Sequence, residues 1–270
     1  MCWAGILDKD KKLKTKRIIY FNIRGMSHFY LPGNWSENPI IAPIELRHHL
    51  RVRRIRVDQE FEVFNGNGKI AQARIVHEPT DKQTLLSLSH IQEDTSLESP
   101  YPIVLLQGLA ANEKMDWIIE KAVELGVHHI IPLQMERSIV RLDDKKAEKK
   151  LTHWQQIVVA SCEQCGRSVL PTIEAAQTLQ HYLQNISPLD NQLALYLSPT
   201  ADLKLVSVLK RAPGQNLMFM VGPEGGFSPE ENLAIAAKGF TGVNLGKRVL
   251  RTETTGIVAM SAVHSVWGQF

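Results

Sequence analysis

The chain has 270 residues and a mass of 30.4 kDa, and its 44% hydrophobic and 22% charged residues exclude a wholly disordered protein. No apolar run approaches the roughly 18 residues of a membrane-spanning helix, and the lysine-rich start lacks the apolar stretch of a secretory signal. Three cysteines in so long a chain do not predict a disulfide framework, so we expect a cytoplasmic protein of one or two domains with no membrane contact.

The first 25 residues differ in charge from the rest of the chain. Seven of the 31 basic residues but only two of the 28 acidic ones lie there, so the formal charge of +3 comes from this segment. It has no periodic apolar pattern that would dock it on a core. We interpret residues 1–25 as a basic extension that is disordered, or that precedes a natural start at Met26.

From about residue 29 to 91 the sequence has the pattern of short strands separated by turns. A hairpin turn is expected at residues 65–68, because the sequence Asn-Gly-Asn-Gly tolerates positive φ. A short helix is expected at 44–50, and strands are expected at 29–31, 60–64, 69–76 and 84–88. These elements predict a small β-barrel or sandwich over residues 26–95, and the polar, proline-marked residues 96–102 are interpreted as a linker.

After Pro102 strands alternate with helices, which predicts an α/β domain over residues 103–270 with a parallel sheet covered on both faces. Strands are expected at 103–107, 127–133, 193–197, 217–221 and 243–245. Helices are expected at 113–125, 146–165, 201–209, 229–238 and 252–267. Asn112 and Thr252 are the expected N-caps of two of these helices, and Ser228 with Glu231 forms an expected capping box beside Pro229.

A glycine-rich turn, VGPEGGFSPEE at 221–231, leaves an expected strand and opens an expected helix. In open α/β sheets ligands bind at the carboxyl ends of the strands, and glycines let a ligand approach the backbone closely. Helix capping explains Ser228 and the residues after it, but it does not explain Glu224. We therefore predict a ligand-binding loop made of Gly222, Pro223, Glu224, Gly225 and Gly226.

A second loop of this kind, LGKRVLRTETT at 245–255, also leaves a strand and enters a helix. Two such loops at neighbouring strand ends could converge on one pocket. The alternative is a solvated basic turn in front of a capped helix.

The segment RHHLRVRRIR at 47–56 holds five arginines with interleaved apolar residues. Guanidinium groups bind phosphate in a bidentate geometry, which favours contact with RNA or DNA over a merely solvated face. The candidate contact residues are Arg47, His48, His49, Arg51, Arg53, Arg54 and Arg56. The two histidines are adjacent rather than at metal-ligand spacing, so no metal site is expected here.

Cys162 and Cys165 form a lone CxxC inside an expected helix, which is typical of two buried-face thiols rather than of a zinc or redox site. The sequence has no GxGxxG, Walker A or GxSxG motif. Their absence argues against Rossmann cofactor enzymes, P-loop NTPases and α/β-hydrolases.

Six segments in chain order resemble the small-subunit ribosomal RNA methyltransferase E family. They are HHLRVRR (48–54), EKMDWIIEKAVELGV (113–127), IPLQMERS (131–138), CEQCGR (162–167) and the two loops at 221–231 and 245–255. The resemblance implies a PUA-like β-domain followed by a SPOUT-type parallel sheet with a C-terminal trefoil knot. It also implies a homodimer that binds S-adenosylmethionine in the knot and methylates N3 of one uridine in the 16S RNA of the small ribosomal subunit.

Carried over residue by residue, the resemblance places the cofactor pocket on Leu197, Ser198, Gly222, Pro223, Glu224, Gly225, Gly226, Leu245, Gly246, Val249, Leu250 and Arg251. Methylation of N3 requires loss of its proton, and the candidate bases are Glu224 and Glu253. We favour Glu224, because Glu253 lies in the first turn of the last helix, where the helix dipole lowers its basicity. Arg251 is the candidate to stabilise charge on a uracil oxygen or to hold the target phosphate.

Two alternatives stay open. A SPOUT enzyme that methylates the ribose 2′-oxygen would share the glycine-rich loop, although such enzymes resemble one another in an Asn-rich third motif that this chain lacks. A non-catalytic RNA-binding assembly factor could retain the same fold.

Overall fold

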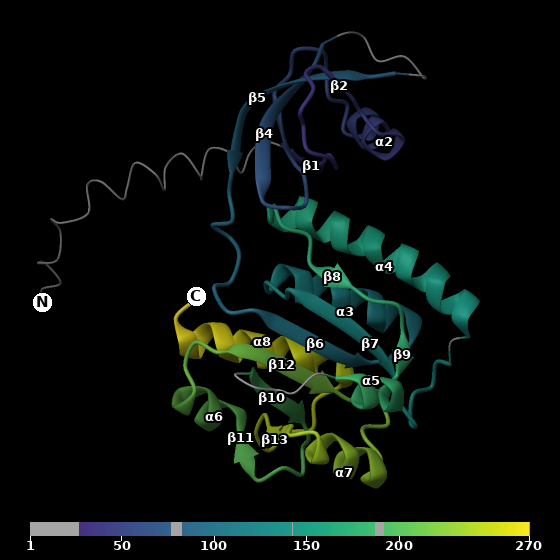
Figure 1. Cartoon of the computed structure of the whole chain (residues 1–270), viewed down its shortest axis with the longest axis vertical. Helices are drawn as coiled ribbons and strands as arrows, with labels where there is room; N and C mark the ends of the chain where they lie inside the picture. The colour runs from purple at the N-terminus through teal and green to yellow at the C-terminus, as the bar shows by residue number, and fades with distance from the viewer. Residues whose placement is uncertain (1–26, 77–82, 142, 187–191, 270) are drawn as a thin grey trace, which may run out of the picture. The chain divides into compact units, whose positions relative to one another are not determined.

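The computed structural model describes residues 27–76, 83–141, 143–186 and 192–269 (Figure 1). The predicted basic extension, residues 1–25, lies outside the described residues. The chain divides into two units between Thr95 and Ser96, and each unit is described by itself. In the described ranges, no helix has both the length and the apolar character needed to cross a membrane.

The first unit is a five-stranded sheet with one helix. The strands lie in the order β1-β3-β4-β5-β2; β1 pairs with β3 in parallel and the other pairs are antiparallel. The elements are β1 (His28–Tyr30), β2 (Ile40–Ile41), α2 (Ile44–Val52), β3 (Phe61–Phe64), β4 (Lys69–Ile75) and β5 (Leu85–Glu93). The sequence predicted all of these except β2, which has only two residues. The strand expected at 84–88 ends too early, because β5 continues to Glu93.

The predicted hairpin turn joins β3 to β4. The Asn65 side-chain oxygen accepts hydrogen bonds from the amides of Asn67 at 2.8 Å and Lys69 at 3.0 Å. Gly66 and Gly68 have φ values of 84° and 89°, a region that costs glycine little. The turn therefore forms from local chemistry, as the sequence predicted.

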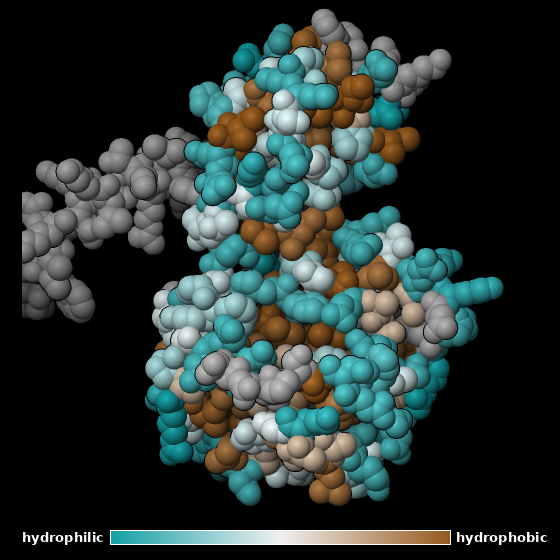
Figure 2. All heavy atoms as spheres, in the orientation of Figure 1, coloured by the Kyte–Doolittle hydropathy of each residue, from teal (hydrophilic) through white to brown (hydrophobic). Residues whose placement is uncertain are grey.

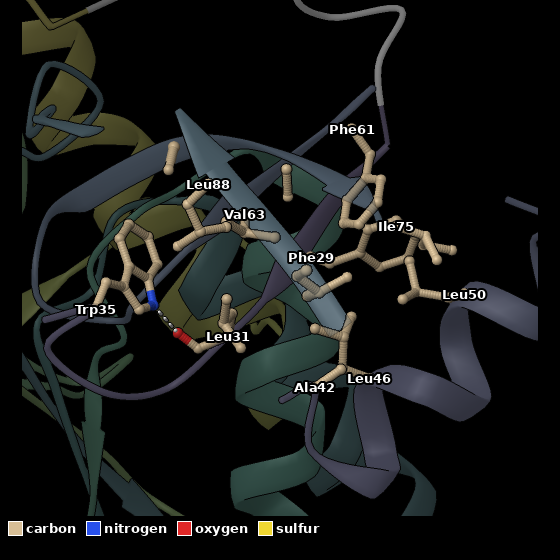
Figure 3. Close-up of a cluster of buried hydrophobic side chains, with 13 residues drawn as sticks. Phe29, Leu31, Trp35, Ala42, Leu46, Leu50, Phe61, Val63, Ile75 and Leu88 are labelled. Atoms are coloured by element: carbon tan, nitrogen blue, oxygen red, sulfur yellow. Dashed lines mark hydrogen bonds between the residues drawn. The ribbon is translucent and has the colours of Figure 1, made fainter. Parts of the chain in front are cut away.

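The core of the first unit lies between its sheet and α2 (Figure 3). The rings of Phe29 and Phe61 meet edge to face, with centroids 5.6 Å apart. Leu46 and Leu50, one helical turn apart, contribute the apolar side of α2 and are buried. Burial of such side chains stabilises the sheet and fixes the position of the arginines that share the helix.

The second unit is an eight-stranded sheet in which every pairing is parallel, as predicted. The order is β11-β13-β10-β12-β6-β7-β8, and β9 pairs with β7. In chain order the elements are β6 (Ile103–Gly108), α3 (Asn112–Glu124), β7 (His129–Gln134), α4 (Asp144–Cys165), β8 (Thr172–Ile173), β9 (Gln177–Thr178), α5 (Leu179–Asn185), β10 (Gln192–Leu197), β11 (Leu203–Lys204), α6 (Leu205–Arg211), β12 (Asn216–Val221), α7 (Pro229–Ala237), β13 (Thr241–Asn244) and α8 (Thr252–Trp267).

Helices cover both faces of this sheet. On one face Leu106 and Met218 pack in a cluster with residues of α5 and α7. The alternate residue Leu105 points to the other face, where it lies beside Gly256 of α8. Strands buried on both faces read as continuous apolar runs, which is why β6, β10 and β12 were recognisable in the sequence.

Three local predictions in this unit were wrong. The helix expected at 201–209 begins only at Leu205, because Leu203–Lys204 form the edge strand β11. The N-caps are Ala111 and Arg251 rather than Asn112 and Thr252, which are the first residues of α3 and α8. The hydroxyl of Thr252 bonds to distant residues instead of to its own helix. The capping box of Ser228 and Glu231 is present as predicted.

The segment interpreted as a linker, residues 96–102, belongs to the second unit. Arg167 is 3% exposed, and its guanidinium pairs with Glu98, with Nε 3.0 Å from Oε1. Its Nη1 also donates to the carbonyls of Val123 at 2.9 Å and Val127 at 3.0 Å. Because a buried guanidinium requires charge compensation, Glu98 anchors this segment to the rest of the second unit. Elsewhere, hydrophilic residues cover much of the visible surface of both units (Figure 2).

Candidate functional site

A pocket of about 650 Å³ opens at the carboxyl ends of the neighbouring strands β10, β12 and β13. This volume is typical of small-molecule sites. The structure brings the two predicted loops together around the pocket, and all the candidate cofactor and catalytic residues line it. They are Leu197, Ser198, Gly222, Pro223, Glu224, Gly225, Gly226, Leu245, Gly246, Val249, Leu250, Arg251 and Glu253.

The glycine-rich loop is tightly packed on one side and open on the other. A Cβ atom on Gly225 would lie 2.8 Å from the Cβ of Arg137, so this side has no room for a side chain. At Gly226, where φ is 67°, a Cβ would meet nothing within 4 Å. A Cβ on Gly246 of the second loop would also meet nothing within that distance. The glycines thus leave backbone exposed to a ligand in the pocket.

A buried hydroxyl joins the two loops. Thr252 Oγ1 donates to the carbonyl oxygen of Gly222 at 2.6 Å and accepts from Gln107 Nε2 at 3.0 Å. Gln107 also donates to the carbonyl of Gly108 at 2.9 Å. Gln107 and Thr252 are 0% and 6% exposed, so this network is shielded from water. It holds the start of α8 against the end of β12 and so fixes the shape of the pocket.

Glu224 is held at the pocket by donors at the start of α3. Its Oε1 accepts from the amide of Ala111 at 3.1 Å and from Lys114 Nζ at 3.2 Å. The same Nζ lies 3.8 Å from Oε2 of Glu253, whose other oxygen lies 4.0 Å from Nη1 of Arg251. Both candidate bases therefore share one ammonium group.

The environment of Glu224 lowers its pKa. Partial burial favours the protonated form and raises the pKa, but hydrogen bonds from the amide of Ala111 and from its own amide, together with the ammonium of Lys114, lower it by more. Glu224 is therefore ionised at neutral pH. This makes it a ready hydrogen-bond acceptor and a weaker base than an unperturbed glutamate.

Two charged residues of the pocket lie outside both predicted loops and were not predicted from the sequence. Lys114 lies in the first turn of α3, and Arg137 lies after β7 and donates from Nη1 to the carbonyl of Gly225 at 3.3 Å. Both follow strands, but only the strand order places β6 beside β12. The start of α3, which follows β6, then contacts Glu224 of the glycine-rich loop. Position after a strand was the available signal, and it does not say which strands are neighbours.

The arginine run occupies α2 and the turn after it, in the first unit. Four of its members gather around a hollow of about 670 Å³ with apolar residues such as Ile55; they are Arg47, Arg51, Arg54 and Arg56. The remaining candidates, Arg53, His48 and His49, do not line this hollow, and Arg53 is the C-cap of α2. The arginines thus form a concentrated basic surface beside an apolar floor.

The CxxC cysteines lie in the last turn of α4 as free thiols. Cys162 is fully buried and Cys165 is half-buried; burial raises the pKa of Cys162 to about 12 and also raises that of Cys165. Within the described ranges, no group of three or more histidine, cysteine, aspartate or glutamate residues could hold a metal ion.

Comparison with known proteins agrees with this architecture. A family model described as an RNA methyltransferase domain matches residues 97–264, and one described as an RNA methyltransferase PUA domain matches residues 45–87. Ribosomal RNA small subunit methyltransferase E of Buchnera aphidicola is 30% identical over 84% of this chain and 87% of its own length. The Bacillus subtilis protein of the same name is 31% identical over 81% of this chain and 86% of its own length.

Two solved structures are similar over nearly the whole chain. Ribosomal RNA small subunit methyltransferase E from Neisseria gonorrhoeae, bound to S-adenosyl methionine, has a TM-score of 0.81 and 35% identity, covering 90% of this chain and 98% of its own. A methyltransferase from Legionella pneumophila in complex with the same cofactor has a TM-score of 0.82 and 31% identity, covering 89% and 97%. The chain therefore belongs to the ribosomal RNA small subunit methyltransferase E family.

Proposed function

We propose that this chain transfers a methyl group from S-adenosylmethionine to ribosomal RNA of the small subunit, at N3 of one uridine in 16S RNA. The observation that carries the proposal is the convergence of both predicted loops on one pocket, in a chain 35% identical to a relative whose structure contains S-adenosyl methionine. Because the proposed substrate is ribosomal RNA, we also propose that the protein acts in the cytoplasm.

The pocket fits this cofactor. The open glycines Gly226 and Gly246 leave space for a ligand beside exposed backbone, and the apolar side chains of Leu197, Val221 and Leu250 provide a surface for an aromatic base. When bound, the cofactor supplies a methyl group activated by a sulfonium sulfur. The loops that Thr252 joins orient the ligand, and such positioning supplies much of the rate enhancement.

The chain must also accept the proton of the uracil N3. Glu224 is our first candidate, since its Oε2 is buried and accepts no hydrogen bond from any described residue. Oε2 of Glu253 is in the same state, so Glu253 is the second candidate. Arg251, whose side chain is 83% exposed, extends to where it can stabilise charge on a uracil oxygen or hold a phosphate.

Two glutamine variants test the assignment of the base. If Glu224 accepts the proton, Glu224→Gln binds cofactor within a few-fold but loses most turnover, and the loss shrinks as pH rises because hydroxide then ionises the uracil. A deficit equal at neutral and alkaline pH would mean that Glu224 moves no proton. The same pH-dependent deficit in Glu253→Gln alone would assign the base to Glu253.

RNA contact is proposed for the basic surface of the first unit. Arg51 and Arg54 are both exposed and line the hollow there. Replacing both with alanine should weaken RNA binding and reduce its salt slope by about one per lost phosphate contact, with cofactor affinity unchanged. An unchanged slope would mean that the run is only a solvated face.

The trefoil knot and the homodimer rest on the family resemblance and on the prevalence of closed two-fold pairs among homo-oligomers. Light scattering tests the dimer. A monomer with full activity would show that methyl transfer does not require a dimer.

The decisive experiment is methyl transfer in vitro. The purified chain is incubated with labelled S-adenosylmethionine and small subunits that lack the modification, and the RNA is digested to nucleosides for mass spectrometry. We expect one 3-methyluridine per subunit. A ribose-methylated product would support the 2′-oxygen alternative, and RNA binding without cofactor binding or transfer would support a non-catalytic assembly factor.

A further inference from the structure

Arg137 brings a guanidinium group to the pocket from outside both predicted loops. It lies after β7, and its side chain is exposed and lines the pocket. Its Nη1 donates to the carbonyl of Gly225 at 3.3 Å, and it makes no other hydrogen bond within the described ranges. Because a guanidinium carries several N–H donors in a planar fork, most of its donors are available to a ligand.

The charge of Arg137 also differs in its surroundings from that of two other cations of the pocket. Lys114 Nζ lies 3.2 Å from Glu224 and 3.8 Å from Glu253, and Nη1 of Arg251 lies 4.0 Å from Glu253. Arg137 pairs with no carboxylate of the described residues, although it lines the same pocket. A guanidinium fork without a counter-ion of its own is suited to binding a carboxylate or a phosphate.

The turn that carries Arg137 is closed by two hydrogen bonds. The hydroxyl of Ser138, which is buried, accepts from the amide of Met135 at 3.0 Å, and the amide of Ser138 donates to the carbonyl of Met135 at 3.1 Å. Gly225 packs against this turn, since a Cβ there would lie 2.8 Å from the Cβ of Arg137 and 3.2 Å from its carbonyl oxygen. The base of the arginine side chain is therefore fixed before any ligand binds, which lowers the entropic cost of binding.

Glu231 connects this turn to the glycine-rich loop through both oxygens of its carboxylate. Its Oε2 accepts from the amide of Ser228 at 2.9 Å, which is part of the capping box of α7. Its Oε1 accepts from the amide of Glu136 at 2.8 Å, although the two residues are 95 positions apart. Helix capping explains only the first of these bonds. The second joins the end of β7 to the start of α7 and holds Arg137 beside Gly225.

Building on the proposed function, we propose that Arg137 binds an oxyanion of a bound substrate and that Glu231 is the positioning residue that fixes the turn carrying it. The oxyanion is the carboxylate in the amino-acid part of the methyl donor or a phosphate beside the target base, and a guanidinium fork binds either in a bidentate geometry. The turn after β7 thereby gains a binding role that neither predicted loop contains.

Two ligands that differ in the amino-acid group separate the two sources of the oxyanion. S-adenosylhomocysteine contains the carboxylate, whereas 5′-methylthioadenosine lacks the whole amino-acid part, and the sulfur is neutral in both. If Arg137 binds the carboxylate, Arg137→Gln should weaken binding of the first ligand about tenfold in titration calorimetry and leave that of the second unchanged. If it binds a phosphate, both affinities stay and the salt slope of binding to small-subunit RNA falls by about one.

Two further variants show whether the position and the shape of the group matter. Arg211 is an exposed arginine at the end of α6 that does not line the pocket, so Arg211→Gln removes the same charge elsewhere in the second unit. It should leave the affinity ratio of the two ligands and the salt slope as in wild type. Arg137→Lys keeps the charge without the fork, so it should restore the salt slope but only part of the carboxylate affinity.

The role of Glu231 is tested through Arg137. Glu231→Ala should reproduce the change seen in Arg137→Gln, and the double variant should add little, because both substitutions remove the same contact. Ser228→Ala removes the hydroxyl of the capping box but keeps both bonds of the Glu231 carboxylate, so it should leave the affinity ratio and the salt slope unchanged. Glu231→Gln replaces the alanine variant if that variant does not fold. Additive effects of the substitutions at 137 and 231 would mean that Glu231 only caps α7.

Unchanged affinities for both ligands together with an unchanged salt slope in Arg137→Gln would overturn the inference, since the guanidinium would then be only solvated. Failure of the wild-type chain to bind either ligand or to transfer methyl groups would refute the proposed function instead. In that case the salt slope of RNA binding still decides whether Arg137 binds an oxyanion, and absence of RNA binding as well would overturn both.

Discussion

Replacing Thr252 with valine removes the hydroxyl that joins the two loops while keeping the shape of the side chain. The carbonyl of Gly222 then loses its donor at 2.6 Å in a buried site. Gln107 Nε2 loses one acceptor but keeps the carbonyl of Gly108. A buried polar group left without a partner costs about 1–3 kcal/mol, so we expect a loss of about 2 kcal/mol in the free energy of unfolding of the second unit. For a unit of this size that lowers Tm by roughly 4–8 °C.

Thr255→Val is the matched control, because it makes the same chemical change three residues further along α8. The Thr255 hydroxyl donates to the carbonyl of Arg251, which also accepts the amides of Thr254 and Thr255 and therefore stays paired. We expect a cost below about 0.5 kcal/mol. Urea unfolding and calorimetry measure both variants, and isothermal titration should show weaker cofactor binding in Thr252→Val. Equal stability of the two variants would refute the reasoning.

Three further predictions follow from the geometry. Glu224→Gln should have a smaller free energy of unfolding than wild type at neutral pH, and the difference should shrink as pH falls. The reason is that a lowered carboxylate pKa contributes stability that is lost on acidification through that pKa. Urea unfolding that gives the same difference at pH 7 and pH 3 would contradict this. Gly225→Ala should weaken cofactor binding at least tenfold in titration calorimetry, because its Cβ would lie 2.8 Å from that of Arg137; near-normal affinity would show that the loop adapts. Cys162 should resist alkylation in the native protein at pH 8 and react on unfolding, since it is buried and its pKa is raised to about 12. Rapid labelling of Cys162 in the native protein, measured by mass spectrometry, would show that the thiol is not buried.

The features predicted correctly from the sequence are those determined by local chemistry. The hairpin turn at Asn65 and the capping box of Ser228 and Glu231 each form within a few residues. The apolar runs of the parallel strands stand out because both faces of each strand are buried. A resemblance in residue motifs then supplied the proposed ligand, which no local pattern contains.

The features that were missed depend on contacts distant in sequence. Thr252 has the residue type of an N-cap, but its hydroxyl bonds to Gly222 and Gln107, 30 and 145 positions away. Lys114 gains significance only from strand order, which places it against Glu224, 110 positions along the chain. The two-residue strands β2, β8, β9 and β11 are too short to leave a periodic signal.

The pairing of β6 with β12 also bears on how the chain acquires its binding site. These central strands are separated by more than a hundred residues, and the pocket walls come from β10, β12, β13 and the start of α8, near the end of the chain. Contacts of such sequence separation form slowly, because a long loop must close before they are made. During synthesis the first unit can fold while the pocket walls are still missing. Cofactor binding should therefore appear only with the last refolding phase, which makes it a direct reporter of complete folding.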